Sequence, residues 1–153
     1  MAIPTGSKVP DFPTVDQQGV RRQFSDYLAD GPVVLFFYPK AFTTGCTKES
    51  CHFRDLAGEF AELGAQRIGV SADSVERQAE FDAKHSLGFP LLSDSDRAIA
   101  KVFGVKRMGP LLNKRSTFVI GTDLTLLADI SSEMNMEVHA DEALAVLRRE
   151  QQR

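Results

Sequence analysis

Apolar and polar positions along the chain alternate between short continuous runs and helical spacing. Residues 31–39, GPVVLFFYP, form an unbroken run of β-forming residues bounded by prolines, which is typical of a strand buried on both faces. Residues 66–71, QRIGVS, predict a second buried strand, and residues 89–94, FPLLSD, predict a short third. Between these strands, residues 43–63 and 73–85 have the spacing of helices.

The flanking segments complete this alternation. Residues 11–24 alternate on either side of Gly19 and predict a short β-hairpin or an extended N-terminal arm. After residue 94 the pattern predicts, in chain order, a helix at 95–104 that Gly104 caps, a loop at 109–115, a hairpin of strands 116–121 and 124–131, and an amphipathic helix at 141–153. Strands alternating with helices indicate an α/β fold with a mixed sheet, and the length favours one domain over residues 1–153.

Both cysteines of the chain, Cys46 and Cys51, fall in the predicted helix at 43–63. At about 100° per residue, Cys46 shares one apolar face with Phe53, Phe60 and their neighbours Leu56 and Ala57. Cys51 lies about 140° away from Cys46, among polar residues. A free cysteine packs like a small apolar residue, which accounts for Cys46 but leaves Cys51 without a packing role.

An intact helix does not allow a disulfide between these two cysteines. Five helical residues span about 7.5 Å along the axis, whereas a disulfide requires Cα atoms within roughly 7 Å and suitably directed Cβ atoms. Two alternatives remain open. Either the pair never bridges, or the first turns of the helix unwind when it does.

Cys46 also stands where a helix begins. With Thr43 as the N-cap, Cys46 is the third helical residue, and the helix dipole there favours a thiolate. A free cysteine has a pKa of about 8.5, and lowering it to about 6 takes roughly 3.4 kcal/mol. A helix N-terminus supplies at most about 2 kcal/mol, whereas a cation at about 4 Å supplies around 4 kcal/mol. We therefore expect a nearby cation, and Arg115 is the best-placed candidate; the alternatives are an inert buried thiol and a solvated arginine.

Composition narrows the classes of function. The formal net charge of −3 argues against a nucleic-acid partner, which requires a clustered basic surface. No apolar run approaches the roughly 20 residues of a membrane span, and no signal peptide is visible, so a cytoplasmic protein is expected. In that compartment a close cysteine pair indicates catalysis or metal binding rather than a structural disulfide.

A metal-binding module would use Cys46, Cys51 and His52. On an intact helix these three side chains do not converge, and no fourth ligand is evident, because His85 and His139 are expected at the surface. A thiol–disulfide oxidoreductase acting on proteins is a further alternative, but that class uses a C-x-x-C spacing.

The segment YPKAFTTGCTKESCHFRDL resembles the active-site segment of peroxiredoxins of the Q-type or bacterioferritin comigratory protein group. The pattern P-x-x-x-T-x-x-C is met by Pro39, Thr43 and Cys46, and a second cysteine five positions later, as at Cys51, marks that group. The resemblance covers nearly the whole chain and includes residues 6–12, 89–94 and 114–120. It implies a thioredoxin-like fold whose mixed central sheet is flanked by helices and extended by an N-terminal β-hairpin.

The resemblance also implies a reaction. Cys46 would be the peroxidatic cysteine, which reduces hydrogen peroxide and organic hydroperoxides and becomes a sulfenic acid. Cys51 would resolve it as an intramolecular disulfide, which thioredoxin or a similar dithiol reduces. No metal, flavin or haem is expected. A one-cysteine peroxidase and a redox sensor or chaperone that uses the same thiols remain as alternatives.

Four further residues receive roles from the resemblance. Thr43 would hydrogen-bond the sulfur and the peroxide oxygen, Pro39 would shield the pocket from water, Arg115 would stabilise the thiolate and Glu49 would orient Arg115. The chain departs from the group at Thr44, where many members have proline. Because proline at the first helical position favours the helix, its absence should loosen the first turn.

Members of this group are often monomers, so a monomer is expected. A weak homodimer is the alternative, with Met136 and Leu112 as candidate contact residues.

Overall fold

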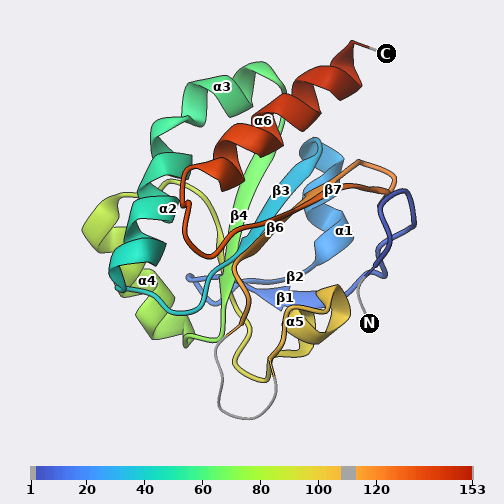
Figure 1. The fold of residues 1–153 in the computed structure, drawn as a ribbon. Coiled ribbons are helices and arrows are strands. Elements are labelled where there is room, and N and C mark those ends of the chain that lie inside the picture. Colours follow the sequence, from blue (N-terminus) through green and yellow to red (C-terminus); the bar gives the residue numbers. More distant parts are fainter. Residues whose placement is uncertain (1–2, 108–112, 153) are drawn as a thin grey trace.

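The centre of the molecule is a mixed five-stranded sheet in the order β5-β4-β3-β6-β7 (Figure 1). The computed structural model describes residues 3–107 and 113–152. The strands are β3 (Val33–Phe37), β4 (Gln66–Ser71), β5 (Leu91–Ser93), β6 (Ser116–Ile120) and β7 (Leu126–Ser131). Strands β3, β4 and β5 are parallel, whereas β6 and β7 are antiparallel to their neighbours. The predicted α/β fold with a mixed sheet is confirmed, and the arrangement is thioredoxin-like.

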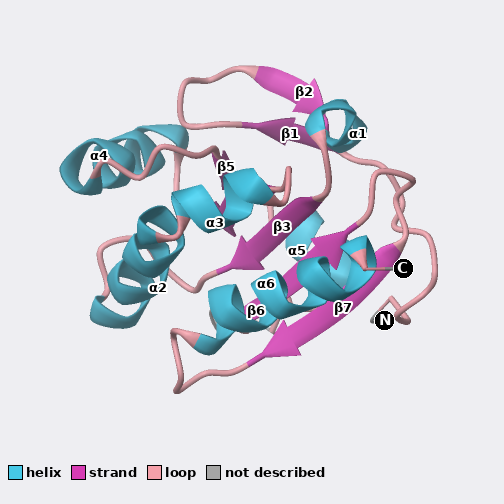
Figure 2. Cartoon of the chain, turned by 90° about the horizontal axis from the view of Figure 1, so that it is seen from above, coloured by secondary structure: helices cyan, strands magenta, loops and turns pink. Residues whose placement is uncertain are grey.

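Helices cover both faces of this sheet, as Figure 2 shows from above. One face carries α2 (Thr44–Asp55), α3 (Ala57–Glu62), α4 (Val75–His85) and α6 (Val138–Gln151). The other face carries α1 (Phe24–Tyr27), the 3-10 helix η1 (Leu28–Asp30) and α5 (Ala98–Phe103). Strands β1 (Pro13–Val15) and β2 (Arg21–Gln23) pair as an antiparallel hairpin, so the hairpin alternative for residues 11–24 is confirmed.

Strand β3 is apolar throughout because it contributes to both cores. Val33, Leu35 and Phe37 point into the core beneath α1 and α5, whereas Val34 and Phe36 point into the core beneath α2 and α6. All five side chains are fully buried. This continuous run is therefore the expected signature of a strand covered on both faces.

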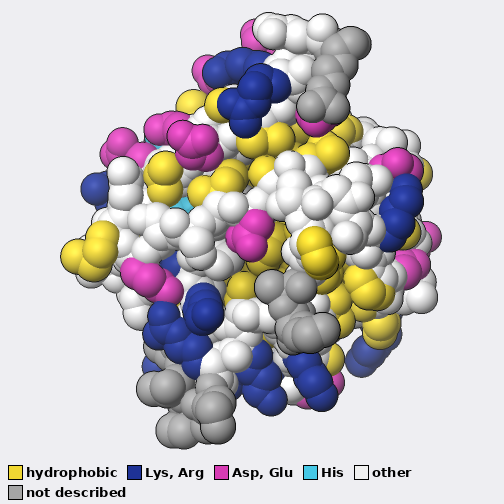
Figure 3. Space-filling view, turned by 45° about the vertical axis from the view of Figure 1, so that its right-hand side comes forward, with side chains coloured by type: hydrophobic (Ala, Val, Ile, Leu, Met, Phe, Trp, Pro, Cys, Tyr) yellow, Lys and Arg dark blue, Asp and Glu magenta, His cyan; other side chains and the backbone are white. Residues whose placement is uncertain are grey.

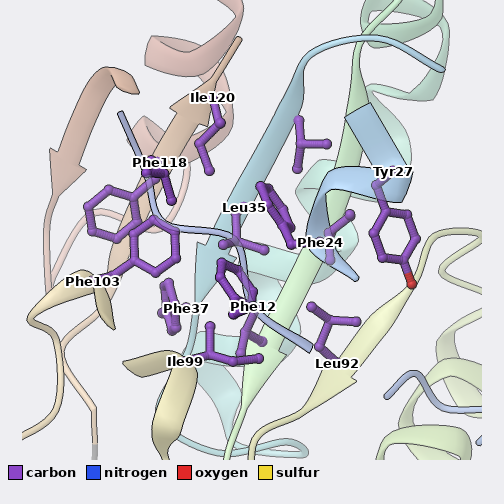
Figure 4. Packing of buried hydrophobic residues seen from close by; sticks show 14 of the residues in the cluster. Phe12, Phe24, Tyr27, Leu35, Phe37, Leu92, Ile99, Phe103, Phe118 and Ile120 are labelled. Atoms are coloured by element: carbon purple, nitrogen blue, oxygen red, sulfur yellow. The ribbon is translucent and has the colours of Figure 1, made fainter. Parts of the chain in front are cut away.

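Aromatic rings fill the core beneath α1 and α5 (Figure 4). Phe12, from the segment before β1, stacks on Phe24 of α1 with ring centroids 4.8 Å apart. Phe103 of α5 packs against Phe118 of β6 at 4.7 Å and against Phe37 of β3 at 5.4 Å. These contacts between distant segments attach the N-terminal hairpin and α5 to the sheet.

The predicted helix at 43–63 is interrupted at Leu56, where the backbone leaves helical geometry (φ −94°, ψ 18°). The carbonyl of Phe53, which a continuous helix would bond to the N–H of Ala57, accepts a hydrogen bond of 2.9 Å from Arg67 of β4 instead. Helix α3 then begins at Ala57. Ala57, expected on the apolar face, is exposed, whereas Phe60 of α3 is buried as that face predicts.

Two other helices differ in detail from their predicted form. Helix α6 begins at Val138, three residues before the predicted start. In α4, Gln78 is fully buried, whereas the apolar residues Val75 and Ala79 are only half-buried. Gln78 accepts a hydrogen bond from the Tyr38 hydroxyl and donates one of 2.9 Å to the Leu92 carbonyl, so buried polar groups rather than apolar packing fix α4 at this point.

The face drawn in Figure 3 carries side chains of both charges, with several basic ones toward the bottom of the view and apolar side chains across its middle. Within residues 3–107 and 113–152, no helix has the length and apolar content to cross a bilayer. Most of the predicted loop at 109–115, including Leu112, lies outside the described residues.

Phe53 joins α2 to the sheet, and its removal should destabilise the fold. Its ring is fully buried and stacks on Phe36 of β3 at 4.2 Å. We expect Phe53→Ala to lower the free energy of unfolding by about 3–5 kcal/mol, because it leaves a cavity between α2 and β3. Urea denaturation followed by circular dichroism measures this loss. Met134→Ala is the control, because Met134 is 91% exposed and should change stability by less than about 0.5 kcal/mol; equal losses would contradict the prediction.

Candidate active site

Cys46 lies in the first turn of α2 and is fully buried. Thr43 has an extended backbone (φ −78°, ψ 155°) and is the N-cap residue, so Cys46 is the third helical residue, as predicted. The Thr43 hydroxyl does not cap the helix but donates to the Lys40 carbonyl at 2.8 Å. The first-turn backbone N–H groups lack partners within the helix, so they and the helix dipole favour an anion at this end of α2.

A buried guanidinium lies against the Cys46 thiol. Arg115, which directly precedes β6 and is 6% exposed, places Nη2 at 3.3 Å from Cys46 Sγ. Its Nη1 donates to Glu49 Oε1 at 2.6 Å. Glu49 follows Cys46 by three residues, so both side chains point from the same face of α2. The structure therefore brings together the predicted residues Cys46, Glu49 and Arg115.

Gly45 leaves the space that Arg115 occupies. A Cβ atom on Gly45 would lie 3.3 Å from Arg115 Nη2 and 3.3 Å from the Met136 sulfur. Both distances are tighter than ordinary van der Waals contact, so a larger residue would push the guanidinium away from Cys46. Met136, a candidate for a dimer contact, is 8% exposed and packs here instead.

Behind Glu49 lies a second buried titratable group that the sequence did not suggest. His139 of α6 is fully buried, with Nδ1 at 3.6 Å from Glu49 Oε2. Nδ1 also lies 2.7 Å from the Thr117 hydroxyl, and Nε2 lies 2.9 Å from the Ser132 carbonyl. The expectation of a surface position for His139 was wrong, because α6 starts early enough to turn residue 139 inward. The spacing of His139, Ala143 and Val146 along one helix face was the available signal.

Burial sets the protonation of this pair. Desolvation raises the pKa of Glu49 to about 8, although the charge of Arg115 acts in the opposite direction. Burial lowers the pKa of His139, and the nearby charge of Arg115 adds to this effect. Around neutral pH these shifts favour a protonated carboxyl group on Glu49 beside a neutral imidazole.

The other predicted site residues lie around the start of α2. Pro39 is half-buried in the connection between β3 and α2, and Thr43 is exposed. Cys51 is half-buried on the same helix as Cys46, and both thiols are free. The predicted incompatibility of an intact helix with a disulfide agrees with this state.

The metal-binding alternative gains no support. Across the described parts of the chain, no group of three or more His, Cys, Asp and Glu side chains converges as metal ligands would. His52 instead places Nε2 at 2.9 Å from Asp141 of α6. His85, the other expected surface histidine, is half-buried against the ring of Phe81.

A buried thiol at a helix N-terminus beneath a guanidinium, within a thioredoxin-like fold, defines the class of thiol peroxidases. Comparison with known proteins agrees. Residues 5–128 match the model of the AhpC/TSA family. The crystal structure of peroxidoxin BcpB from Mycobacterium tuberculosis is 56% identical, with a TM-score of 0.91 over 95% of this chain and 96% of that one. Peroxiredoxin Bcp of Bacillus subtilis is 39% identical over 97% of both chains.

A structure of a Xylella fastidiosa PrxQ mutant is 30% identical, with a TM-score of 0.89 over 99% of both chains. The chain belongs to the AhpC/TSA family and is close to its Bcp and PrxQ-type peroxiredoxins. It is therefore a peroxidase that acts through thiol chemistry.

Arg115 should control the reactivity of Cys46. In a Cys51→Ser background, we expect Arg115→Ala to slow the reaction of Cys46 with hydrogen peroxide by about 10²–10³-fold at neutral pH. Arg115→Lys should recover only part of this loss, because a lysine cannot contact sulfur and carboxylate with one planar fork. Stopped-flow kinetics measures the rate. Arg22→Ala, on the distant hairpin, is the control, and an Arg115→Ala rate equal to that control would contradict the prediction.

Proposed function

We propose that this peroxidase reduces hydrogen peroxide and organic hydroperoxides through Cys46, and that Cys51 resolves the oxidised product as an intramolecular disulfide. A dithiol carrier such as thioredoxin then reduces that disulfide. The observation that carries the proposal is the 3.3 Å contact between Cys46 Sγ and Arg115 Nη2 at the N-terminus of α2. The two cysteines on one helix supply the second half of the cycle.

In the first step, the Cys46 thiolate attacks one peroxide oxygen, and the O–O bond breaks. Sulfenic acid forms on Cys46, and water or an alcohol leaves after taking up a proton. The guanidinium of Arg115 and the first-turn N–H groups of α2 stabilise the negative charge that moves to the leaving oxygen. Because Thr43 and Thr44 are exposed while Cys46 is buried, the peroxide approaches over the start of α2.

Thr43 and Pro39 shape this approach. The Thr43 hydroxyl already donates its proton to the Lys40 carbonyl, so its lone pairs remain to accept a hydrogen bond from the peroxide O–H. Pro39, which is half-buried in the connection before α2, offers no N–H to bind water and would help to keep water from the pocket. Both features align a hydroperoxide without requiring any charge on the substrate.

In the second step, Cys51 reaches Cys46 only if the start of α2 unwinds. The C-terminal half of α2 is well anchored, because Phe53 stacks on Phe36, and Arg54 donates to the His85 carbonyl at 2.6 Å. The N-terminal turn is held through Cys46 and Glu49, which both contact Arg115. Unwinding is therefore expected to begin at Thr44 and to stop before Phe53.

The proposal includes the cellular location of the protein and its oligomeric state. A cytoplasmic location fits a cycle that depends on a dithiol reductant. A monomer is favoured because, over the described part of the chain, the exposed large apolar side chains are Val20 and Met134, which give no broad apolar patch.

The resolving role of Cys51 can be tested by intact mass. After one equivalent of hydrogen peroxide, we expect the reduced protein to lose two hydrogens and to resist alkylation. Cys51→Ser should instead gain one oxygen on Cys46, and Cys46→Ser should not change. If the wild-type protein gained oxygen while Cys51 stayed alkylatable, the chain would be a one-cysteine peroxidase or sensor. No reaction at Cys46 would remove the peroxide chemistry proposed for that thiol.

The first turn of α2 should limit the rate of disulfide closure. Thr44 is the first helical residue and is exposed, and Thr43 before it has the extended backbone that a following proline requires. Thr44→Pro should therefore stabilise the helical state by about 0.4–1 kcal/mol and slow closure about twofold to fivefold. Rapid-quench mass spectrometry measures closure. Sulfenic acid formation in the same variant is the internal control, and faster closure would contradict unwinding from this end.

A further inference from the structure

Two buried titratable groups lie behind Arg115, and no part in proton balance has been given to either of them so far. Glu49 and His139 are both 0% exposed. Within the residues described, Glu49 Oε2 has no hydrogen-bond partner, although it lies 3.6 Å from His139 Nδ1. A buried carboxylate oxygen without a partner is costly. A proton on that oxygen lowers this cost, because the buried group then carries no charge.

The contacts of His139 fix its tautomer. The Ser132 carbonyl can only accept a hydrogen bond, so Nε2 carries the hydrogen at 2.9 Å. Nδ1 of the neutral ring is then an acceptor, and it takes the hydrogen bond of the Thr117 hydroxyl at 2.7 Å. Glu49 Oε2 lies 3.6 Å from the same nitrogen, beyond hydrogen-bond distance. The imidazole therefore faces Glu49 with neither a positive charge nor an N–H that could stabilise an ionised carboxylate.

The charges around Arg115 determine whether Glu49 is better protonated or ionised. The guanidinium is always positive. A Cys46 thiolate balances it, and an ionised Glu49 would add a second negative charge that competes with the sulfur for the same cation. Glu133 already faces the cluster, since its Oε1 accepts from the Arg115 backbone N–H at 3.1 Å and from Arg107 at 2.7 Å. Tyr38 lies near the Cys46 side of the cluster.

We propose that, around neutral pH, Glu49 holds a proton on Oε2, on the side of His139 Nδ1, while Cys46 is a thiolate. The proton leaves the full charge of Arg115 to the sulfur and to the transition state. When Cys46 is neutral, Glu49 ionises and balances Arg115 itself. His139 acts through Glu49 and is a positioning residue. The inference rests on Cys46 as the peroxidatic cysteine, and it deepens the proposed function.

A pH dependence follows, and its sign is defined. Burial raises the pKa of Glu49 to about 8. Above that pH, Glu49 loses its proton, draws the charge of Arg115 and weakens stabilisation of the leaving oxygen. The rate of Cys46 oxidation should therefore decline by roughly threefold to tenfold above about pH 8.

The first test is the pH profile of Cys46 oxidation by hydrogen peroxide in a Cys51→Ser background. Glu49→Gln should abolish the decline, because an amide keeps the Arg115 contact without titrating. His139→Gln should move the decline to lower pH, since an amide N–H can donate to the ionised carboxylate of Glu49. Thr117→Val should move it to higher pH, because Nδ1 is freed for Glu49.

His52→Gln is the matched control, since His52 also joins α2 to α6, through Asp141. It should leave the decline in place. A wild-type rate that stays level above pH 8, or one unchanged decline across all variants, would overturn the proposal. If Cys46 is oxidised but its rate shows no such decline, the proposed protonation of Glu49 is wrong, whereas the proposed peroxidase function stands.

A second measurement does not depend on folding of the core variants. The infrared difference spectrum between the reduced wild-type protein and Cys46→Ser, at neutral pH, should show a protonated carboxyl band in the wild-type protein. Serine carries no charge, so Glu49 ionises in that variant, and Glu49→Gln should remove the wild-type band. Absence of the band in the thiolate form of the wild-type protein would overturn the proposal.

Discussion

A guanidinium group buried beside a thiol is the constraint on which this site depends. Arg115 cannot lose its proton, and a buried cation is tolerated only where acceptors or negative charge surround it. Cys46 at 3.3 Å and Glu49 at 2.6 Å meet that requirement, and both come from the first two turns of α2. The contact thus couples the position of α2 to the start of β6, and it explains why a carboxyl group is buried one turn from the reactive sulfur.

The sheet register brings these segments together. Phe37, the last residue of β3, pairs with Ser116, the first residue of β6. After β3 the chain passes through a short connection that contains Pro39, and α2 starts at Thr44. Arg115 directly precedes β6, so it lies at the same end of these two strands. Because β6 runs antiparallel to β3, the residue before β6, Arg115, lies beside the start of the helix that follows β3. The pairing of β3 with β6 therefore sets the position of Arg115 relative to Cys46.

The sequence predicted the strands of the central sheet and the longer helices, but not α1, η1 or the second half of the charge network. The need for a positive charge near Cys46 followed from the weakness of the helix dipole, with Arg115 as the best-placed candidate, and the resemblance to a known family gave Arg115 that role. His139 was missed because the periodic pattern of α6 was recognised only from residue 141, whereas the helix begins at Val138. The break at Leu56 was missed because the hydrogen bond found there involves Arg67, a residue of another element. Hydrogen bonds between elements do not change the spacing of apolar residues in the sequence, so that spacing cannot predict them.

Helix α2 must satisfy two opposed demands. It must be formed to place Cys46 against Arg115, and in the proposed cycle it must open to let Cys51 reach the oxidised sulfur. The structure separates these demands along the helix, because aromatic stacking and backbone contacts hold the region of Phe53, whereas the first turn is held through groups that contact Arg115. Oxidation turns an anionic sulfur into a neutral sulfenic acid and so weakens one of those contacts. The chemical step therefore loosens the same turn whose opening the next step requires.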